Sequence, residues 1–305
     1  SAKLPTNAET ITLTEATSQA QVRDEFEFDE LGLAISNPMS DSYAEYRCDY
    51  ELWEVDSGFM MYIGCNVTYS KFFDDGTLRT FLTYGIDRQT LVDDNYGGLA
   101  LPTTLPISPM SPYYSKSLAA NYDYDEMRFI DAASKFRVPT NDKGVPRTLQ
   151  LLVNSDDSAR LRCARNIAAT LTELGLACET VESPTSVYEA RLQAANYDIY
   201  LGITKLPTTA DLSEFYRPWG EMSWGGLANE TIYNMVNQSL ADRGNYYNLH
   251  KLVADDGRII PVMAGYYAIY AKRGVLSDLN PARDNVFYYT LGKTMESSKV
   301  ATQFS

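Results

Sequence analysis

Polar side chains stand at two points where a buried apolar run ends, and these residues have the chemistry to bind a ligand. They are Asn154 and Ser155 after the run LQLLV, and Thr204 and Lys205 after the run DIYLGI, where the apolar Leu206 follows as a further candidate by its position. Amide, hydroxyl and ammonium groups recognise small polar molecules through hydrogen bonds and charge. Because ligands of parallel α/β sheets gather beyond the carboxyl ends of the strands, the pattern predicts a binding site here.

Aromatic side chains form a second candidate group. The chain has 23 tyrosines against 11 phenylalanines, so it often selects the aromatic residue that both stacks and forms hydrogen bonds. Trp219 and Trp224 bracket the loop WGEMSWGG, where two large apolar rings favour a binding role over packing. The alternative for any single candidate residue is ordinary surface packing.

Several kinds of catalytic or metal site are excluded or disfavoured. His250 is the only histidine, which excludes a histidine triad and a multi-histidine metal site. It lies within a predicted helix, and we expect it to face solvent or the edge of the core. Asp123, Asp125 and Glu126 open another predicted helix, which favours capping and surface charge over acid–base catalysis.

The four cysteines do not form a metal or redox motif. Cys48, Cys65, Cys163 and Cys178 lack paired C-x-x-C spacing, so we expect buried thiols, with one disulfide left open as an alternative. We therefore expect no metal and no cofactor.

Length and charge limit the function classes. At roughly 150 residues per domain, 305 residues suffice for about two domains. The net charge of −14 would repel a nucleic-acid backbone, so a nucleic-acid partner is not expected. No apolar run reaches the ~18 residues of a membrane-spanning helix.

The segment 149–203 has the clearest pattern of secondary structure. Two apolar runs flank a long apolar stripe at helical spacing, which Ser155 or Asp156 can cap and Gly175 can end. A shorter helix over 188–196 and a third apolar run follow. Strand, helix, strand, helix, strand in this order predicts a parallel sheet with right-handed crossovers.

Other segments have weaker patterns. We expect mainly strands over 11–65, one helix over 75–93, a proline-rich loop over 102–112, helices over 229–240 and 246–255, and an extended segment over 258–272.

Several of these segments together resemble one protein family. The stretch from Ile63 to Pro109, with Gly85, Ile86, Asp87 and Arg88 at its centre, is similar to a characteristic strand, helix and proline loop of that family. The stretches over 149–203 and 229–272 are similar to later parts of the same pattern. The family is family 5 of the bacterial extracellular solute-binding proteins, the dipeptide and oligopeptide receptors of ABC importers, and the resemblance covers about residues 60–290.

The resemblance implies a fold. It is α/β and periplasmic-binding-protein-like, of the class II type. Residues 63–261 would form the second lobe, a parallel-rich sheet flanked by helices, with the crossover strands. Residues 1–62 and 262–305 would form a partial, more β-rich first lobe. We expect the chain to begin partway through such a protein.

The resemblance also implies a function. The protein would bind a peptide or another small polar solute between two lobes and deliver it to a membrane permease. The lobes would close about strands near 63–66 and 261–267, which places Tyr69 and Tyr267 near the hinge as further ligand contacts. We expect a monomer outside the cytoplasm, extracellular or periplasmic, anchored through a lipid-modified cysteine upstream of this chain, without enzymatic activity.

One position departs from the family pattern. Peptide receptors of the family resemble one another in an acidic residue that pairs with the peptide's amino terminus, and Leu206 stands at the matching position. Asp211 substitutes for it only if its loop doubles back, and Lys205 favours an acidic or carboxylate ligand. The alternatives to a receptor are a hydrolase that uses Asp or Glu pairs, and a non-transport interaction domain with the same fold.

Overall fold

The chain forms two compact units. The computed structural model describes residues 12, 14–39, 46–274, 279 and 281–283. One unit combines residues 1–57 with 265–305, and the larger unit is residues 58–264. Strands β2 (Tyr50–Cys65) and β7 (Ile259–Lys272) continue from one unit into the other. The assignment of lobes divided at 62/63 and 261/262 stays a prediction.

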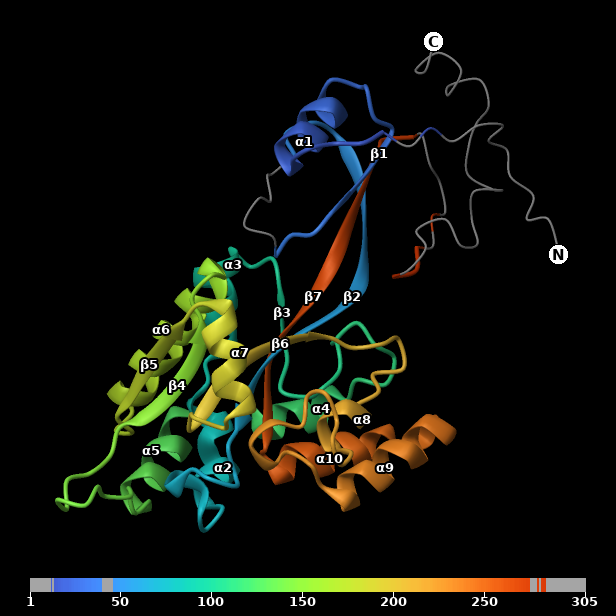
Figure 1. Ribbon diagram of the computed structural model, residues 1–305. Helices are drawn as coiled ribbons and strands as arrows, with labels where there is room; N and C mark the ends of the chain where they lie inside the picture. Colours follow the sequence, from blue (N-terminus) through green and yellow to red (C-terminus); the bar gives the residue numbers. More distant parts are fainter. Residues whose placement is uncertain (1–11, 13, 40–45, 275–278, 280, 284–305) are drawn as a thin grey trace. The chain divides into compact units, whose positions relative to one another are not determined.

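The larger unit contains a mixed sheet with the strand order β7, β2, β6, β4, β5 (Figure 1). Its strands, besides β2 and β7, are β3 (Leu101–Pro102), β4 (Leu149–Asn154), β5 (Cys178–Ser183) and β6 (Ile199–Lys205). β4 pairs in parallel with both β5 and β6, whereas β2 runs antiparallel to β6. The predicted strand–helix–strand–helix–strand unit over 149–203 is confirmed.

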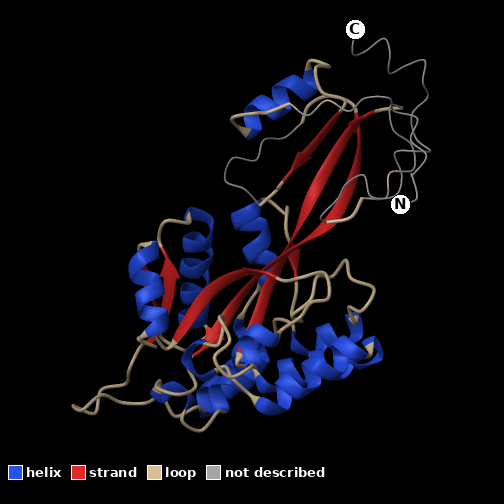
Figure 2. Cartoon of the chain, turned by 45° about the vertical axis from the view of Figure 1, so that its right-hand side comes forward, coloured by secondary structure: helices blue, strands red, loops and turns tan. Residues whose placement is uncertain are grey.

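Helices surround this sheet (Figure 2). The α-helices of the larger unit are α2 (Thr77–Phe81), α3 (Arg88–Tyr96), α4 (Lys116–Ala119), α5 (Glu126–Lys135), α6 (Ser158–Glu173), α7 (Thr185–Gln193), α8 (Ser213–Tyr216), α9 (Glu230–Ala241) and α10 (Tyr246–Asp256). Short 3-10 helices lie at η1 (Lys71–Phe73), η2 (Leu82–Gly85), η3 (Ala120–Tyr122), η4 (Trp224–Gly226) and η5 (Arg243–Asn245). The predicted helices over 229–240 and 246–255 and the extended segment over 258–272 are confirmed.

Helix α6 begins later than the sequence predicts. Its cap is Asp157, whose carboxylate accepts a hydrogen bond from the Arg160 amide, and not Ser155 or Asp156. The Asp156 carboxylate binds Thr185 instead, so it is not available to the helix. The predicted end at Gly175 is confirmed, because this residue has φ of +98°, which glycine adopts without steric cost.

The predicted single helix over 75–93 is wrong. The segment forms α2, η2 and α3, with an extended turn at Ile86 and Asp87. The Asp87 carboxylate accepts a hydrogen bond from the Thr90 amide and starts α3 as a new helix. A methyl group at Gly85 would lie 2.6 Å from the Phe129 ring, so the absence of a side chain at this position lets η2 pack directly against α5.

The smaller unit contains a helix within the segment 11–65, for which the sequence predicts mainly strands. Helix α1 (Gln19–Glu27) is capped by Ser18 and buries Phe26. Strand β1 (Leu33–Ser36) pairs antiparallel with the end of β7, as expected for the more β-rich unit. Residues 11, 13 and 40–45 of the segment predicted as mainly strands lie outside the described residues.

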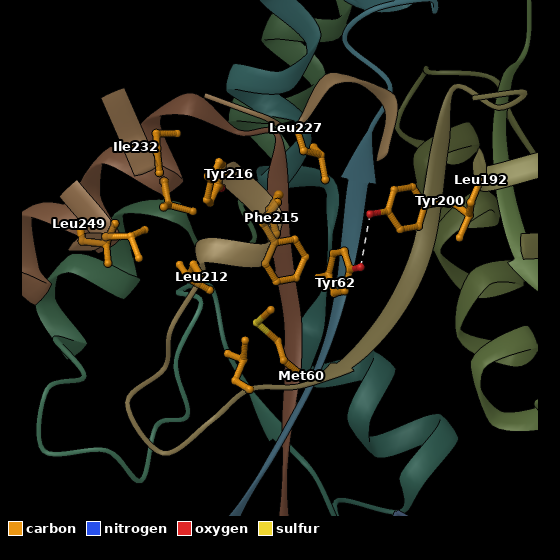
Figure 3. Close-up of a cluster of buried hydrophobic side chains, with 14 of the residues drawn as sticks. Met60, Tyr62, Leu192, Tyr200, Leu212, Phe215, Tyr216, Leu227, Ile232 and Leu249 are labelled. Atoms are coloured by element: carbon orange, nitrogen blue, oxygen red, sulfur yellow. Dashed lines mark hydrogen bonds between the residues drawn. The ribbon is translucent and has the colours of Figure 1, made fainter. Parts of the chain in front are cut away.

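Two tyrosines of the core, labelled in Figure 3, each lie opposite a glycine across strands β2 and β6. Tyr62 on β2 faces Gly202 on β6, and Gly64 faces Tyr200, so each ring lies over the glycine opposite. The two hydroxyls are hydrogen-bonded at 3.3 Å, and Phe215 packs edge-on against Tyr62. The two rings can lie across the opposite strand only because both glycines lack a side chain.

Arg88 is a buried structural arginine. It is 1% exposed and donates hydrogen bonds to the carbonyl oxygens of Thr83, Ile86, Thr103 and Pro261 at 2.9–3.2 Å. It also donates to the Thr83 hydroxyl at 2.8 Å, and burial lowers its pKa to about 10. The side chain joins η2, the proline-rich loop and β7.

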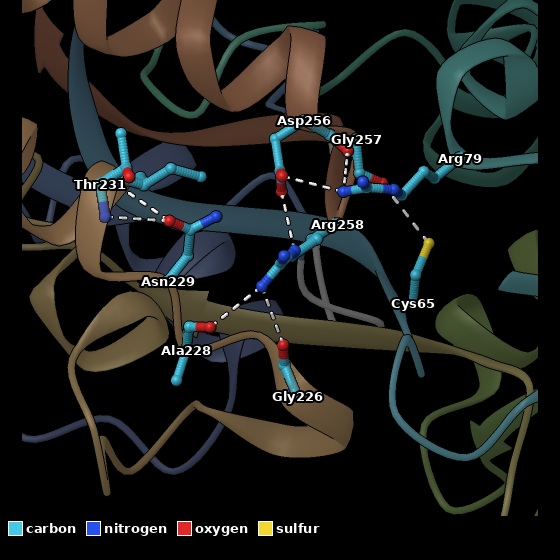
Figure 4. A network of polar contacts seen from close by, with 10 residues as sticks. Cys65, Arg79, Gly226, Ala228, Asn229, Thr231, Asp256, Gly257 and Arg258 are labelled. Carbon is cyan, nitrogen blue, oxygen red and sulfur yellow. Dashed lines mark hydrogen bonds and ion pairs between the residues drawn. The ribbon is translucent and has the colours of Figure 1, made fainter. Parts of the chain in front are cut away.

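A second polar network fixes the turn between α10 and β7 (Figure 4). Arg79 donates to the backbone oxygen and to Oδ1 of Asp256, both at 2.8 Å. Arg258 lies 3.2 Å from Asp256 Oδ2 and donates to the carbonyl oxygens of Gly226 and Ala228. This network has a structural role within the larger unit.

His250 does not face solvent or the edge of the core. It is 1% exposed on the inner face of α10, beside the Tyr246 ring. Neither ring nitrogen has a hydrogen-bond partner among the described residues, and burial lowers its pKa to about 4. The prediction for this residue is wrong because α10 turns its apolar stripe, and the histidine within it, inward.

Candidate ligand-binding site

The parallel strands of the larger unit end on one edge of the sheet. β4 lies between β6 and β5, so the chain moves from β4 to β5 on one side and then returns across β4 to β6. With right-handed crossovers, this order puts α6 and α7 on opposite faces. It creates a topological switch point between β4 and β6, outside their carboxyl ends, where ligands of open α/β sheets bind.

Asn154 and Asp156 form a hydrogen-bonded network at the end of β4. The buried Asn154 donates from Nδ2 to Thr185 Oγ1 at 3.0 Å and accepts from the Asp156 amide at 2.9 Å. Asp156 Oδ2 accepts from the Thr185 hydroxyl at 2.7 Å and the Thr185 amide at 2.8 Å. The half-buried Ser155 donates its amide proton to the Ser183 carbonyl. The network joins the turns that follow β4 and β5.

The Asp156 carboxylate is exposed but fixed in direction. The amide and hydroxyl of Thr185 stabilise its charged form and lower its pKa below the ordinary value. Both bonds fall on Oδ2, and among the described residues no hydrogen bond reaches Oδ1. One oxygen of an ionised group is therefore presented to solvent.

Residues 204–206 differ in how accessible they are. Thr204 is half-buried opposite Met60, and Lys205 is exposed opposite Phe59. Leu206 is buried in the core that contains Tyr62, and its amide donates to the Gly58 carbonyl at 2.8 Å. The Lys205 side chain is thus the most accessible of the three.

The loop after Leu206 is held against the helices. The Tyr246 hydroxyl donates to the Thr209 carbonyl, and Ala210 packs against the proline-rich loop. Asp211 accepts a hydrogen bond from the Ser213 amide at 2.8 Å, at the start of α8. Its carboxylate therefore serves the local turn.

Tyr69 and Trp224 lie at the other end of the sheet from Lys205. Asn66, directly after β2, accepts from the Tyr69 amide and donates its own amide proton to Asp198, at the amino end of β6. Trp224 opens η4, which binds the backbone just after Asn66 and packs on the core. Because β6 has seven residues, these two side chains are roughly 20 Å of strand away from the carboxyl edge.

Trp219 is separate from both groups. It is 95% exposed, with φ of +62°, in a tight loop held by hydrogen bonds to Glu214. The structure therefore does not bring the two tryptophans together, and Trp224 is largely engaged in packing. Tyr267 belongs to the smaller unit, where it is half-buried in β7.

Sequence reasoning missed Asp156 and Thr185 as members of this site. Asp156 was assigned to a helix cap because it precedes an apolar stripe, and Thr185 lies 29 residues away. A signal was available, because Thr185 follows the strand that pairs with β4 in the predicted parallel sheet. Its place after that strand puts it on the same edge as Asn154.

A comparison with family profiles assigns the chain to a known family. The profile for bacterial extracellular solute-binding proteins, family 5 Middle, matches residues 4–226. The chain belongs to this family. The match begins well before residue 60, where the resemblance in the sequence becomes visible, and it ends before α9 begins.

Several solved structures share the fold. A putative peptide-binding protein AppA from Clostridium difficile matches with a TM-score of 0.72 at 14% identity, over 92% of this chain and 60% of that one. The oligopeptide-binding protein AppA from Bacillus subtilis, in complex with a nonapeptide, matches with 0.64 at 15% identity, over 91% and 58%. Lactococcal OppA, with an endogenous peptide, matches with 0.68 at 11% identity, over 91% and 58%. The predicted periplasmic-binding-protein-like α/β fold is confirmed.

The chain spans about 60% of the length of the AppA and OppA structures that it matches. Comparison with curated proteins gives no match. Within the described residues, no helix is long and apolar enough to cross a membrane, and no three His, Cys, Asp or Glu side chains are grouped as metal ligands. The four cysteines are free thiols, of which Cys65 and Cys163 are buried.

Proposed function

We propose that this family 5 chain is part of a receptor that binds a peptide, or another small polar solute, and delivers it to the permease of an ABC importer. The supporting observation is the carboxyl edge of β4 and β6, where Asn154, Ser155, Thr204 and Lys205 surround a topological switch point. By description, proteins with the same fold include an ABC transporter substrate-binding protein and an oligopeptide-binding protein.

The protein's place in the cell follows from the family. Family 5 proteins are extracellular solute-binding proteins, which supports a place outside the cytoplasm. We propose in addition that a lipid-modified cysteine upstream of the chain anchors the receptor. We propose a monomer, because a net charge of −14 opposes self-association. Tyr69, Trp219, Trp224 and Tyr267 stay predicted contacts, and none of them lies in the polar network at the carboxyl edge.

Equilibrium dialysis tests the receptor. The full chain is dialysed against an equimolar pool of synthetic tripeptides, and retained peptides are quantified by mass spectrometry. We expect saturable binding of one peptide per chain and unchanged peptide masses after release. Cleavage of the pool without saturable binding would favour the hydrolase, and neither binding nor cleavage would favour the interaction domain.

A further inference from the structure

One hairpin of the larger unit carries positive charge in an otherwise acidic chain. It comprises residues 137–147, between α5 and β4, and we call it the basic hairpin. Its charged residues are Arg137, Lys143 and Arg147 against one acidic residue, Asp142. The whole chain has a net charge of −14. Such a local reversal of sign favours a partner of negative charge.

The three cations of the basic hairpin are not used within the described structure. Arg137 and residues 140–148 are exposed, and among the described residues no carboxylate lies within ion-pair distance of Arg137, Lys143 or Arg147. The neighbouring Lys135 differs, because it pairs with Asp131 on α5 at 2.7 Å. The three free cations are therefore available to an external anion.

The backbone of the basic hairpin is fixed by its own hydrogen bonds. Thr140 and Pro146 form an antiparallel bridge. Between them, the side-chain oxygen of Asn141 accepts from the amides of Lys143 at 2.9 Å and Val145 at 3.1 Å. A surface that is ordered before contact loses less conformational freedom when it binds. The turn therefore presents its cations and Val145 in one arrangement.

The basic hairpin lies at the end of the sheet opposite the candidate ligand-binding site. It leads into the amino end of β4 at Leu149, whereas Asn154 stands at the carboxyl end, about 17 Å of strand away. In Figure 1 the segment projects beside α5, at the lower left of the larger unit. A partner bound here leaves the carboxyl edge accessible to a solute.

The tip of the basic hairpin combines charge with an exposed apolar side chain. Val145 is 54% exposed and stands between Lys143 and Arg147 in the sequence. At a membrane surface, cations attract the phosphates of anionic lipids, and apolar groups enter the boundary between headgroups and acyl chains. A polyanion in solution would use the cations but not Val145. Because charges are screened beyond about 8 Å at physiological ionic strength, a projecting cationic tip is attracted while the acidic remainder adds less repulsion.

We propose that the basic hairpin is a membrane-contact surface, in which Arg137, Lys143 and Arg147 bind the phosphates of anionic lipids and Val145 enters the headgroup layer. This inference rests on the proposed receptor function, because a receptor that delivers a solute to a permease works at a membrane. The contact belongs to the receptor before it docks on the permease, since it leaves the carboxyl edge accessible.

Vesicle sedimentation with the full chain tests the inference. We expect binding to vesicles of phosphatidylglycerol and phosphatidylcholine in equal parts, weakened by added salt, and none to phosphatidylcholine alone. Lys143→Gln and Val145→Ser should each weaken binding by about fivefold. The matched controls Lys116→Gln and Val187→Ser change an exposed lysine on α4 and an exposed valine on α7, and should leave binding unchanged.

Two results would overturn the inference directly: no binding to the anionic vesicles at low ionic strength, or equal weakening by Lys143→Gln and Lys116→Gln. A loss with Lys143→Gln but not with Val145→Ser, together with displacement of the vesicles by soluble polyglutamate, would identify an acidic polypeptide as the partner and also overturn it. Dialysis against the tripeptide pool is independent of this assay. Peptide retention without vesicle binding leaves the receptor function intact, and vesicle binding without peptide retention overturns the receptor function but not the contact surface.

Discussion

At the scale of single residues, packing of the core requires that positions 64 and 202 carry no side chain. A methyl group at Gly64 would lie 2.2 Å from Tyr200 Cε1, and one at Gly202 would lie 2.7 Å from Tyr62 Cζ. Real carbon contacts are longer, so either substitution forces a ring or a strand to move. Because all four residues are paired across β2 and β6, a shift at one pair disturbs the next.

We therefore expect Gly202→Ala to lower the free energy of unfolding by about 1–3 kcal/mol. Denaturant titration followed by circular dichroism measures the change. Gly244→Ala, in the turn between α9 and α10, is the matched control, because its methyl group would approach only the flexible Asp242 side chain. Equal effects of the two substitutions would contradict the tight packing of strands β2 and β6.

The buried His250 makes stability depend on pH. Its pKa falls from 6.5 to about 4 on folding, so the unfolded chain binds a proton more readily between these values. The contribution to stability is complete above pH 6.5 and is lost as pH falls towards 4, by about 3 kcal/mol in total. His250→Phe removes this titration. The difference in unfolding free energy between variant and wild type should change by that amount between pH 7 and 4. If the two unfolding free energies instead vary with pH in parallel, the role of His250 is refuted.

At the scale of elements, Arg88 shows how one side chain joins three segments that local patterns do not connect. Lysine keeps the charge but has one nitrogen in place of a planar fork, so several buried carbonyls lose their donor. Arg88→Lys should lower the free energy of unfolding by about 3 kcal/mol. Thermal and denaturant unfolding measure it. Arg147→Lys, at an exposed arginine, should change stability by less than about 0.5 kcal/mol, and a similar small loss at Arg88 would argue against the joining role.

Elements with a strong apolar period were predictable from the sequence, and elements defined by contacts were not. β4, α6, α9 and α10 lie close to their predicted bounds because the apolar stripe of each faces the core. The break between η2 and α3 was not predictable, because it depends on Phe129 and Arg88 meeting the backbone from distant positions. Helix α1 was missed because its apolar residues, apart from Phe26, are few.

The residues of the candidate site also fall into those that the sequence predicted correctly and those that it did not. The strand-end residues Asn154, Thr204 and Lys205 share an edge because a parallel sheet brings the ends of its strands together. Trp224 was grouped with them by residue type and Tyr69 by its place near the predicted hinge, and strand direction separates both from that edge. Whether a residue follows the carboxyl or the amino end of its strand therefore determines its membership of the site more than its side-chain chemistry does.

At the scale of the whole molecule, the two units differ in how the chain builds them. Residues 58–264 are contiguous and contain the core around Tyr62 and the polar networks of Arg88 and Asp256. The other unit combines two segments from opposite ends of the sequence. A contiguous segment with its own core has the requirements of an independent folding unit, whereas neither separate segment has them.

A fragment of residues 58–264 should therefore fold alone. We expect it to unfold in one cooperative denaturant transition and to give a dispersed amide NMR spectrum, because its core and its buried arginine partners are all present. A fragment of equal length, residues 28–234, is the matched control. It lacks α10, β7 and the Pro261 carbonyl that Arg88 binds, so it should unfold without a cooperative transition. If both fragments unfold alike, folding of the larger unit does not require β7. In that case residues 58–264 are a compact unit, but their boundaries are not those of an independently stable one.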